Sequence, residues 1–243
     1  MKERELFANL ITIPPVFVRL DGRTFHSVAE HLGLAKPFDP AFSGAMEQVC
    51  IRFLRESGLS PDLAYTFSDE ISLYFSFLPF GGRVEKIDSI SASFAASALT
   101  LELNLTEPLS FDARIIQVTP EMAVEYLINR QSEAWRNHLN AYCQSALVRE
   151  GLSRKDAAKK LRGLPSRELH EFMYSRGVNL AKTPAWERRG VLVYKQVRNV
   201  EGFNPVSGEL VESLRSAVVP ERNLPVFSSP EGRTFLSGII RSM

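Results

Sequence analysis

The sequence has few cysteines and no long apolar run, and these absences limit where the protein is expected to work. Its 243 residues include only two cysteines, Cys50 and Cys143, in stretches with helical spacing. We therefore expect reduced thiols in the core rather than the disulfides of a secreted protein. No apolar run approaches the roughly 20 residues that a membrane span requires, and residues 1–5 lack the apolar region of a signal peptide. The sequence predicts a cytoplasmic protein with no membrane partner.

Zinc and repeat signatures are missing as well. There is no Cys-x-x-Cys motif and no histidine pair at ligand spacing, which argues against a zinc site. Hydrophobic residues make up 44% and charged residues 23% of the chain, a composition typical of a globular protein with a substantial core. We expect one integrated domain with three parts: a catalytic core (1–120), a long helix with a basic helical region and a returning strand (121–198), and an extension (199–243). The prolines at 220, 225 and 230 indicate that this extension is loop-rich.

Charge is nearly balanced over the chain but unevenly distributed along it. The net charge is +1, yet residues 149–198 hold thirteen Lys or Arg against five Asp or Glu, a net of +8, which leaves −7 for the rest. A basic block on an otherwise acidic protein is typical of one that binds a phosphate-rich partner. A solvated helix face would explain Lys155 and Lys159 equally well.

What the sequence does contain is a short β-branched and aromatic run, residues 16–20, that ends in Asp21 and Gly22. Alternation of apolar and polar residues predicts a strand here. Glycine then permits a tight turn and a close approach to a ligand. The pattern therefore predicts a carboxylate at the end of a strand.

A second alternating stretch, residues 65–77, carries Ser68, Asp69 and Glu70 between its halves. This pattern predicts a hairpin with an acidic tip. Two acidic strand ends can converge on one face of a sheet, where paired carboxylates can hold two Mg²⁺ ions for attack on a phosphorus centre. Because Asp-Gly and Ser-Asp are also ordinary turn residues, two solvated turns are the alternative interpretation.

Hydrophobic spacing and Pro/Gly punctuation predict the remaining elements. We expect helices at 1–14, 25–32, 40–58, 85–104, 120–151, from 153 onward and at 166–176, and strands at 111–118 and 191–197. Strand, helix, hairpin, helix, strand is the order of an α+β fold, in which helices cover one face of an antiparallel sheet. This is the shape of a polymerase palm, here followed by a helical basic region.

Several short motifs follow one another between residues 16 and 195. They are Arg19-Leu20-Asp21-Gly22-Arg23-x-Phe25-His26, Lys36-Pro37, Ser68-Asp69-Glu70, Ala92-Ser93-Phe94-Ala95, Phe111-Asp112-x-Arg114, Arg130-Gln131 and Arg188-Arg189-Gly190-Val191. No single motif is decisive, but in this order they resemble the tRNA-His guanylyltransferase family, which includes the guanylyltransferase-like 3′-5′ polymerases. The resemblance implies the same palm.

The resemblance also implies a two-metal nucleotide site. Asp21 and Asp69 would bind two Mg²⁺ ions together with the Gly22 carbonyl, and Glu70 would assist catalysis, although a residue next to Asp69 in a strand would point to the opposite face. The implied nucleotide-binding residues are Arg19, Gly22, Arg23, Thr24, Phe25, His26, Lys36, Ser68, Lys86 and Arg114. Amides from Gly22 to His26 would cradle a phosphate, and Arg19, Lys86 and Arg114 would hold a second triphosphate. The alternatives are surface ion pairs and a packed histidine.

The implied tRNA contacts lie in the second half of the chain, at Arg130, Arg136, Asn137, Lys155 and Lys159. One motif departs from the family: its eukaryotic members carry His-Ile-Asn-Asn where this chain has Trp135-Arg136-Asn137-His138. Since Trp135 falls on the apolar stripe of its helix, we interpret it as a core residue. This departure argues against dedicated tRNA-His specificity.

The expected activity is Mg²⁺-dependent, template-directed 3′-5′ nucleotide addition that repairs the 5′ end of truncated tRNA. GTP or another nucleoside triphosphate and ATP are the expected substrates, and a dimer or tetramer is the expected assembly. The alternatives are a tRNA-His guanylyltransferase that adds G at position −1, a palm-type nucleotidyl cyclase, and a non-catalytic tRNA-binding protein.

Overall fold

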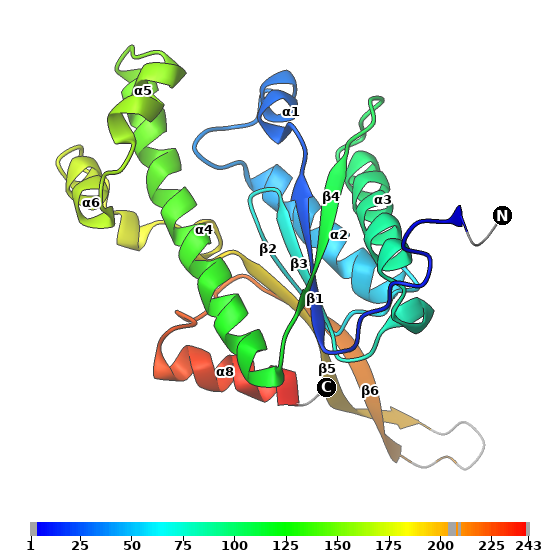
Figure 1. The fold of residues 1–243 in the computed structure, drawn as a ribbon. Helices are drawn as coiled ribbons and strands as arrows, with labels where there is room; N and C mark the ends of the chain where they lie inside the picture. The colour runs from blue at the N-terminus through cyan, green and yellow to red at the C-terminus, as the bar shows by residue number, and fades with distance from the viewer. Residues whose placement is uncertain (1–3, 204–207, 209, 242–243) are drawn as a thin grey trace.

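The structure is a computed structural model that describes residues 4–203, 208 and 210–241. It is organised around a six-stranded antiparallel sheet with the strand order β4-β1-β3-β2-β5-β6 (Figure 1). The strands are β1 (Val16–Gly22), β2 (Leu63–Phe67), β3 (Glu70–Phe75), β4 (Phe111–Gln117), β5 (Val191–Phe203) and β6 (Leu210–Glu221). The predicted α+β fold with an antiparallel sheet is confirmed.

One face of the sheet is covered by α2 (Pro40–Arg55) and α3 (Val84–Glu102) (Figure 1), as the sequence predicted. Side chains alternate between the two faces of a strand, so Val18 and Leu20 of β1 share this face with Leu73 of β3. All three are fully buried in one apolar cluster with residues of both helices. This face is the main hydrophobic core.

Two local signals in the sequence are confirmed at the ends of elements. The Asp39 carboxylate accepts a hydrogen bond from the Phe42 N–H at 2.9 Å, and Pro40 takes the first helical position of α2, the arrangement expected of a capped helix. The loop between β2 and β3 consists of Ser68 and Asp69 alone. The hairpin with an acidic tip is therefore present.

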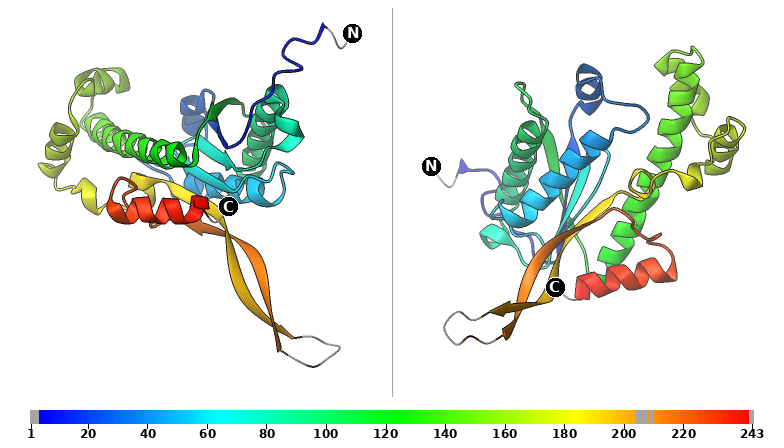
Figure 2. Two further views of the ribbon diagram at one scale, coloured as in Figure 1. Left: turned by 60° about the horizontal axis from the view of Figure 1, so that its bottom comes forward. Right: turned by 180° about the vertical axis from the view of Figure 1, so that it is seen from behind.

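The opposite face of the sheet is covered by the first half of α4 (Pro120–Arg149) and by α8 (Pro230–Arg241) (Figure 2). Phe17 and Leu63 of the strands are buried there against Leu236 of α8 and residues of α4. The sheet thus has helices on both faces, which extends the predicted architecture.

The second half of α4 runs beyond the sheet and carries α5 (Arg154–Leu161) and α6 (Ser166–Tyr174) (Figure 1). A separate apolar cluster holds these helices together; it includes Leu139, Cys143, Leu147, Ala157, Leu169 and Met173. Cys143 and Cys50 are both buried and free, as expected. The shorter elements are α1 (Phe25–His31), η2 (Pro79–Gly82), η3 (Leu180–Lys182) and α7 (Ala185–Arg189). Among the described helices, none combines the length and apolar character needed to cross a bilayer.

The prediction that residues 199–243 are loop-rich is wrong. β5 continues to Phe203 and pairs with β6 in a long hairpin that projects from the body, and α8 packs on the sheet (Figure 2). The prolines that indicated loops mark the ends of regular elements instead: Pro220 lies near the end of edge strand β6 and Pro230 begins α8. Both are positions where the missing N–H of proline is tolerated.

The predicted helix over residues 1–14 is also not found where the structure describes the segment. Residues 5–14 form turns and an isolated bridge. Their backbone is bonded to the end of η2 and to the first residue of α3: the Thr12 N–H donates to the Gly82 carbonyl at 2.9 Å, and the Val84 N–H donates to the Leu10 carbonyl at 3.0 Å. These bonds compete with the bonds that a helix would need.

Candidate active site

The two acidic strand ends meet at one edge of the sheet. β1 ends at Asp21 and Gly22, and the Gly22 N–H donates a hydrogen bond to the main-chain carbonyl of Asp69 at 3.2 Å. Burial raises the pKa of the Asp69 carboxyl, its hydrogen bond with Ser68 opposes the rise, and the nearby charge of Asp21 adds to it. The two carboxylates are therefore close enough to repel each other.

Glu70 joins this group from β3, and the name acidic edge is used below for Asp21, Asp69 and Glu70. That Glu70 points away from its neighbour Asp69 stays a prediction. Glu70 and Asp21 are direct cross-strand partners, so these two side chains share a face. Burial raises the pKa of Glu70, while the charges of Arg130 and Arg19 lower it. Glu70 forms an ion pair with Arg130 at 2.9 Å.

The acidic edge offers oxygen donors for a cation. The described residues contain no group of three or more His, Cys, Asp or Glu side chains that could hold a metal, so a cation would need main-chain or substrate oxygens in addition to Asp21 and Asp69. Oxygen ligands of this kind suit Mg²⁺, which keeps several water or phosphate ligands. Burial, and to a smaller degree the charge of Asp21, raises the pKa of Asp69. A divalent cation would favour the charged carboxylate against both effects, so the donor set fits Mg²⁺.

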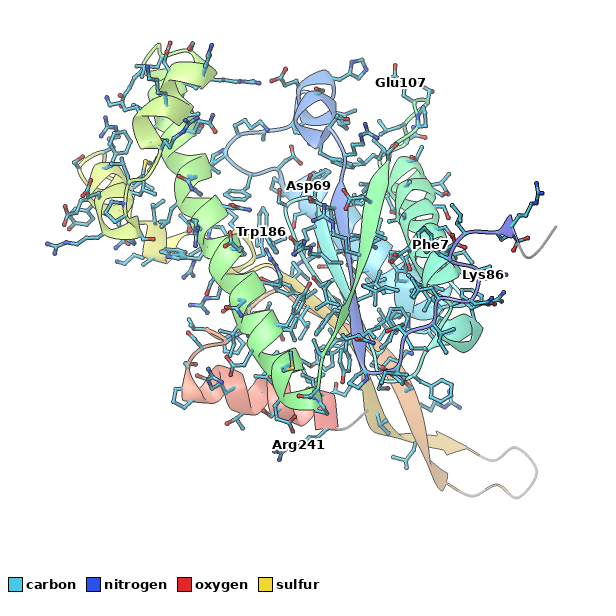
Figure 3. The ribbon with its side chains drawn as sticks, viewed as in Figure 1. Phe7, Asp69, Lys86, Glu107, Trp186 and Arg241 are labelled. Atoms are coloured by element: carbon cyan, nitrogen blue, oxygen red, sulfur yellow. The ribbon has the colours of Figure 1, made fainter. Side chains whose placement is uncertain are left out.

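A cavity of about 430 Å³ adjoins the acidic edge, a size typical of small-molecule sites. The residues predicted to bind ligands that line it are Phe25, Lys36, Ser68, Asp69 and Asn137. Its aromatic lining also includes Phe38, Phe42, Phe67 and Trp186. Figure 3 shows Asp69 and Trp186 in the space between α4 and the sheet. Aromatic rings beside polar groups form a surface on which a nucleobase can stack.

Two contacts near the cavity residue Lys36 connect the end of α4 and the start of α5 to α1 and the loop after it. The Arg149 guanidinium donates to the Lys36 carbonyl at 3.1 Å, and Arg154 of α5 forms an ion pair with Glu30 of α1. Segments that are more than 100 residues apart in the sequence therefore enclose one site.

Two of the three cations expected to hold a second triphosphate lie together. Arg19 of β1 is the direct cross-strand partner of Arg114 of β4, on the face of the sheet that also carries Asp21. Arg114 forms an exposed ion pair with Asp112 at 3.2 Å. Lys86 is not brought to them: it lies at the start of α3 over the Phe80 ring, far from Asp69 in Figure 3.

The expected phosphate cradle between Gly22 and His26 has fewer free amides than predicted. The Gly22 N–H is bonded to the Asp69 carbonyl and the Arg23 N–H to the Ser110 carbonyl at 2.9 Å, so neither of these amides is free for a phosphate. Thr24 takes a left-handed conformation, with φ of 59°, which places the turn before α1. The side chain of His26 lies outside the described part of the chain.

The predicted tRNA contacts are dispersed over the second half of the molecule. Arg130 is largely but not fully buried in its ion pair with Glu70, whereas Arg136 is exposed beside Glu133. Asn137 lines the cavity. The remaining two, at 155 and 159, are exposed on α5.

Much of the cavity wall is formed by residues that the sequence did not predict. Phe38, Trp186 and Glu187 line it from a loop and from α7, and Asn140 and Gln144 line it from α4. The polar face of the long helix was a usable signal, because residues three and four apart share a helix face. The loop and α7 carried no such signal.

Comparison with known proteins places this chain in a family. Residues 1–119 match the family model described as tRNAHis guanylyltransferase. A probable tRNA(His) guanylyltransferase of Dictyostelium discoideum is 31% identical over 218 residues, covering 84% of this chain and 83% of that protein. The tRNA(His) guanylyltransferase of Saccharomyces cerevisiae is 28% identical over 195 residues, covering 74% and 82%.

Solved structures share the fold. A bacterial tRNA(His) guanylyltransferase-like protein in complex with ATP has a TM-score of 0.78 at 23% identity, over 99% of this chain and 96% of that one. The crystal structure of the Saccharomyces cerevisiae enzyme has a TM-score of 0.66 at 26% identity, over 76% of this chain and 87% of that one. The expected palm-like fold is thus confirmed by comparison as well as by the sheet.

Proposed function

This chain belongs to the tRNA-His guanylyltransferase family, a family of nucleotidyltransferases, and from this premise we propose that it transfers nucleotides to the 5′ end of tRNA. The observation that carries the proposal is the junction of the acidic edge with the cavity, since Asp69 belongs to the acidic edge and also lines the cavity. A nucleoside triphosphate in the cavity would have its phosphates at the carboxylates.

The proposed reaction has two steps. The tRNA 5′-phosphate attacks the α-phosphorus of a nucleoside triphosphate such as ATP and releases pyrophosphate. The 3′-hydroxyl of an incoming nucleotide such as GTP then attacks the activated 5′-phosphate and releases the nucleoside monophosphate. Growth is therefore in the 3′-5′ direction.

The acidic edge and the two arginines beside it have different roles in this proposal. Asp21 and Asp69, with the Gly22 carbonyl, would hold two Mg²⁺ ions, which when bound neutralise phosphate charge and stabilise the leaving pyrophosphate. Arg19 and Arg114 lie side by side on the same face and would bind the triphosphate of the incoming nucleotide by charge-assisted hydrogen bonds. Lys86 lies in the first turn of α3, on the other face of the sheet, so we do not give it this role within one chain.

The names of the relatives favour guanylate addition to tRNA-His, and this is our first candidate. Template-directed repair of truncated tRNA is the second, and one observation favours it. The residues aligned with the His-Ile-Asn-Asn motif include Trp135 and His138, which stack on each other at 5.4 Å against the small core of α4–α6. Burial lowers the pKa of His138 to about 4, so this imidazole is a neutral core group at pH 7.

Single-turnover nucleotide addition to a set of tRNAs tests both candidates. The tRNAs would be intact or lack the first 5′ nucleotide, and would differ in the anticodon and at position 72. Guanylate addition that requires a histidine anticodon supports the first candidate. Addition of whichever nucleotide complements position 72, regardless of anticodon, supports the second. Nucleotide turnover without RNA would favour a cyclase, and tRNA binding without any transfer would contradict both candidates.

The remaining sequence predictions belong to the same proposal. Lys155 and Lys159 on exposed α5, with Arg136 and Asn137 on α4, would contact the tRNA backbone. Affinity for tRNA should then fall as salt is added, because phosphate contacts release counterions. We also propose that the protein is cytoplasmic and self-associates as a dimer or tetramer.

A further inference from the structure

The long helix α4 is attached to the sheet by two polar contacts one helical turn apart. The hydroxyls of Tyr126 and Ser72 are hydrogen-bonded at 2.9 Å, and Arg130 pairs with Glu70 at 2.9 Å. Four residues of helix rise about 6 Å, and two residues of strand rise about 7 Å. The two spacings match, so α4 follows β3 toward the acidic edge in a defined register.

The second contact lies in a largely solvent-excluded place. The Arg130 and Glu70 side chains are 16% and 13% exposed, and the Arg130 guanidinium also lies over the Phe67 ring at 5.7 Å. Phe67 and Glu70 are cross-strand partners on β2 and β3, on either side of the two-residue loop. Arg130 therefore contacts both strands of the hairpin that carries Asp69.

Beyond Arg130, the same helix becomes a wall of the cavity. The lining residues from α4 are Ala134, Asn137, Asn140, Ala141 and Gln144, and Asp69 lies across the cavity from them on the hairpin. A helix is stiff over this length because each turn is bonded to the next. A shift of α4 along β3 would therefore move the whole wall relative to Asp69.

We infer that Arg130 is a positioning residue, whose ion pair with Glu70 fixes the α4 wall of the cavity relative to Asp69, and that it is not a tRNA contact. Only the expected effect on nucleotide binding rests on the proposed function. The attachment itself is a property of the protein alone. A charge left without its partner in a largely buried place is strongly unfavourable, whereas removal of both charges is far better tolerated.

The attachment is tested first without ligands, by hydrogen exchange of the full chain. Arg130→Met should make amides of residues 126–141 exchange roughly tenfold faster, and Glu70→Gln/Arg130→Met should restore much of the protection. The matched control is Arg52→Met, which breaks the Arg52–Glu102 ion pair of 2.7 Å between α2 and α3 on the other face and should leave these amides unchanged. Unchanged exchange in Arg130→Met, or an equal effect of Arg52→Met, overturns the attachment.

The consequence is tested by kinetics of the activation step and by tRNA binding. Arg130→Met should raise KM for the nucleoside triphosphate about tenfold, with a smaller change in kcat, and Arg130→Lys should recover part of the loss. Affinity for tRNA should stay within about twofold with the same salt slope. A salt slope lower by about one, the effect of losing one phosphate contact, with KM unchanged would make Arg130 a tRNA contact. If wild type transfers nothing, the proposed function fails, while the exchange result still decides the attachment.

Discussion

The two faces of the central sheet are made by the same strands but are completed differently. Toward α2 and α3, β1 contributes Val18 and Leu20, and this face is apolar along its length. Toward α4, the face is apolar at Phe17 and becomes charged at the end occupied by the acidic edge. The first face mainly stabilises the fold. The second face has charged side chains in place of part of its apolar contacts, and these are the residues to which we assign the reaction. Substitutions on the two faces should therefore separate stability from activity.

The largest effect is expected from Asp21→Ala or Asp69→Ala on the α4 face. If these carboxylates hold the cations of the reaction, either substitution should lower nucleotide addition about 10³-fold or more, as for removal of other strong electrostatic stabilisation. The fold should persist, since neither side chain belongs to an apolar cluster. Single-turnover rates and circular dichroism measure both properties. A variant within tenfold of the wild-type rate would contradict the metal assignment.

The matching change on the other face is Leu73→Ala. Leu73 is fully buried under α2 and α3, so the substitution should lower the free energy of unfolding by about 2–5 kcal/mol. Activity per folded molecule should stay near that of wild type, because β3 directs Leu73 away from the acidic edge. Urea unfolding and rate measurements at low temperature test this. A loss of activity without a loss of stability would erase the distinction between the faces.

A smaller effect is expected from Gly22→Ala, at the point where the faces meet the site. A Cβ on Gly22 would lie 2.4 Å from the Phe25 ring, so the ring, which lines the cavity, must move. Nucleotide addition should fall about 10- to 100-fold, as expected of misplacement by about 1 Å. Gly44→Ala is the control, because its Cβ would meet only the Arg222 side chain at 3.9 Å. An equal result for both glycines would remove Phe25 from the site.

The pH dependence of stability should show the cost of the acidic edge. Burial raises the pKa of Asp69 above its ordinary value of 3.8, so the folded protein binds this proton more tightly than the unfolded chain. Ionisation of Asp69 therefore lowers the free energy of unfolding as pH rises through the pKa of Asp69 in the folded protein. Asp69→Asn should unfold at higher urea than wild type at pH 7, and the difference should shrink toward pH 3.8. A variant less stable than wild type at pH 7 would contradict this sign.

The smallest effect is expected on the α2/α3 side, at Asp88 of α3. Burial raises the pKa of Asp88 from 3.8 to about 6, and its Oδ1 atom has no hydrogen-bond partner among the described residues. Asp88→Asn should stabilise the protein modestly above pH 6, with no gain below pH 3.8, and should leave nucleotide addition unchanged. Thermal unfolding at pH 4 and pH 8 tests it. A change in catalytic rate would contradict the separation of the faces.

Local patterns predicted much of the fold and of the site. Alternation of side chains predicted strand β1 and the acidic hairpin at Ser68-Asp69, and Asp39-Pro40 predicted the start of α2, since each signal acts within a few residues. The chemistry of strand ends brought Asp21 and Asp69 into one hypothesis. The cytoplasmic location and the oligomer stay predictions.

Relations across space could not be obtained in this way. Arg130 is a cation on the polar side of a helix, and nothing in its neighbourhood in the sequence indicates that Glu70, 60 residues earlier, is its partner. Lys86 is implied by the resemblance to bind a triphosphate but lies in the first turn of a helix on the other side of the sheet. The interpretation of Pro220 and Pro230 as loop residues was wrong, because proline is found at the ends of strands and helices as readily as in loops.

The direct pairing of Asp21 with Glu70 has a consequence for how the chain reaches its fold. Since strand side chains alternate with a period of two, a slip of β1 by one residue would reverse its faces. Arg19 and Asp21 would enter the apolar core, and Val18 and Leu20 would face the cavity side. Each uncompensated buried charge is costly, so a slipped chain would be rejected during folding. The charges that we assign to nucleotide chemistry therefore also favour the correct register of β1 over one shifted by a residue.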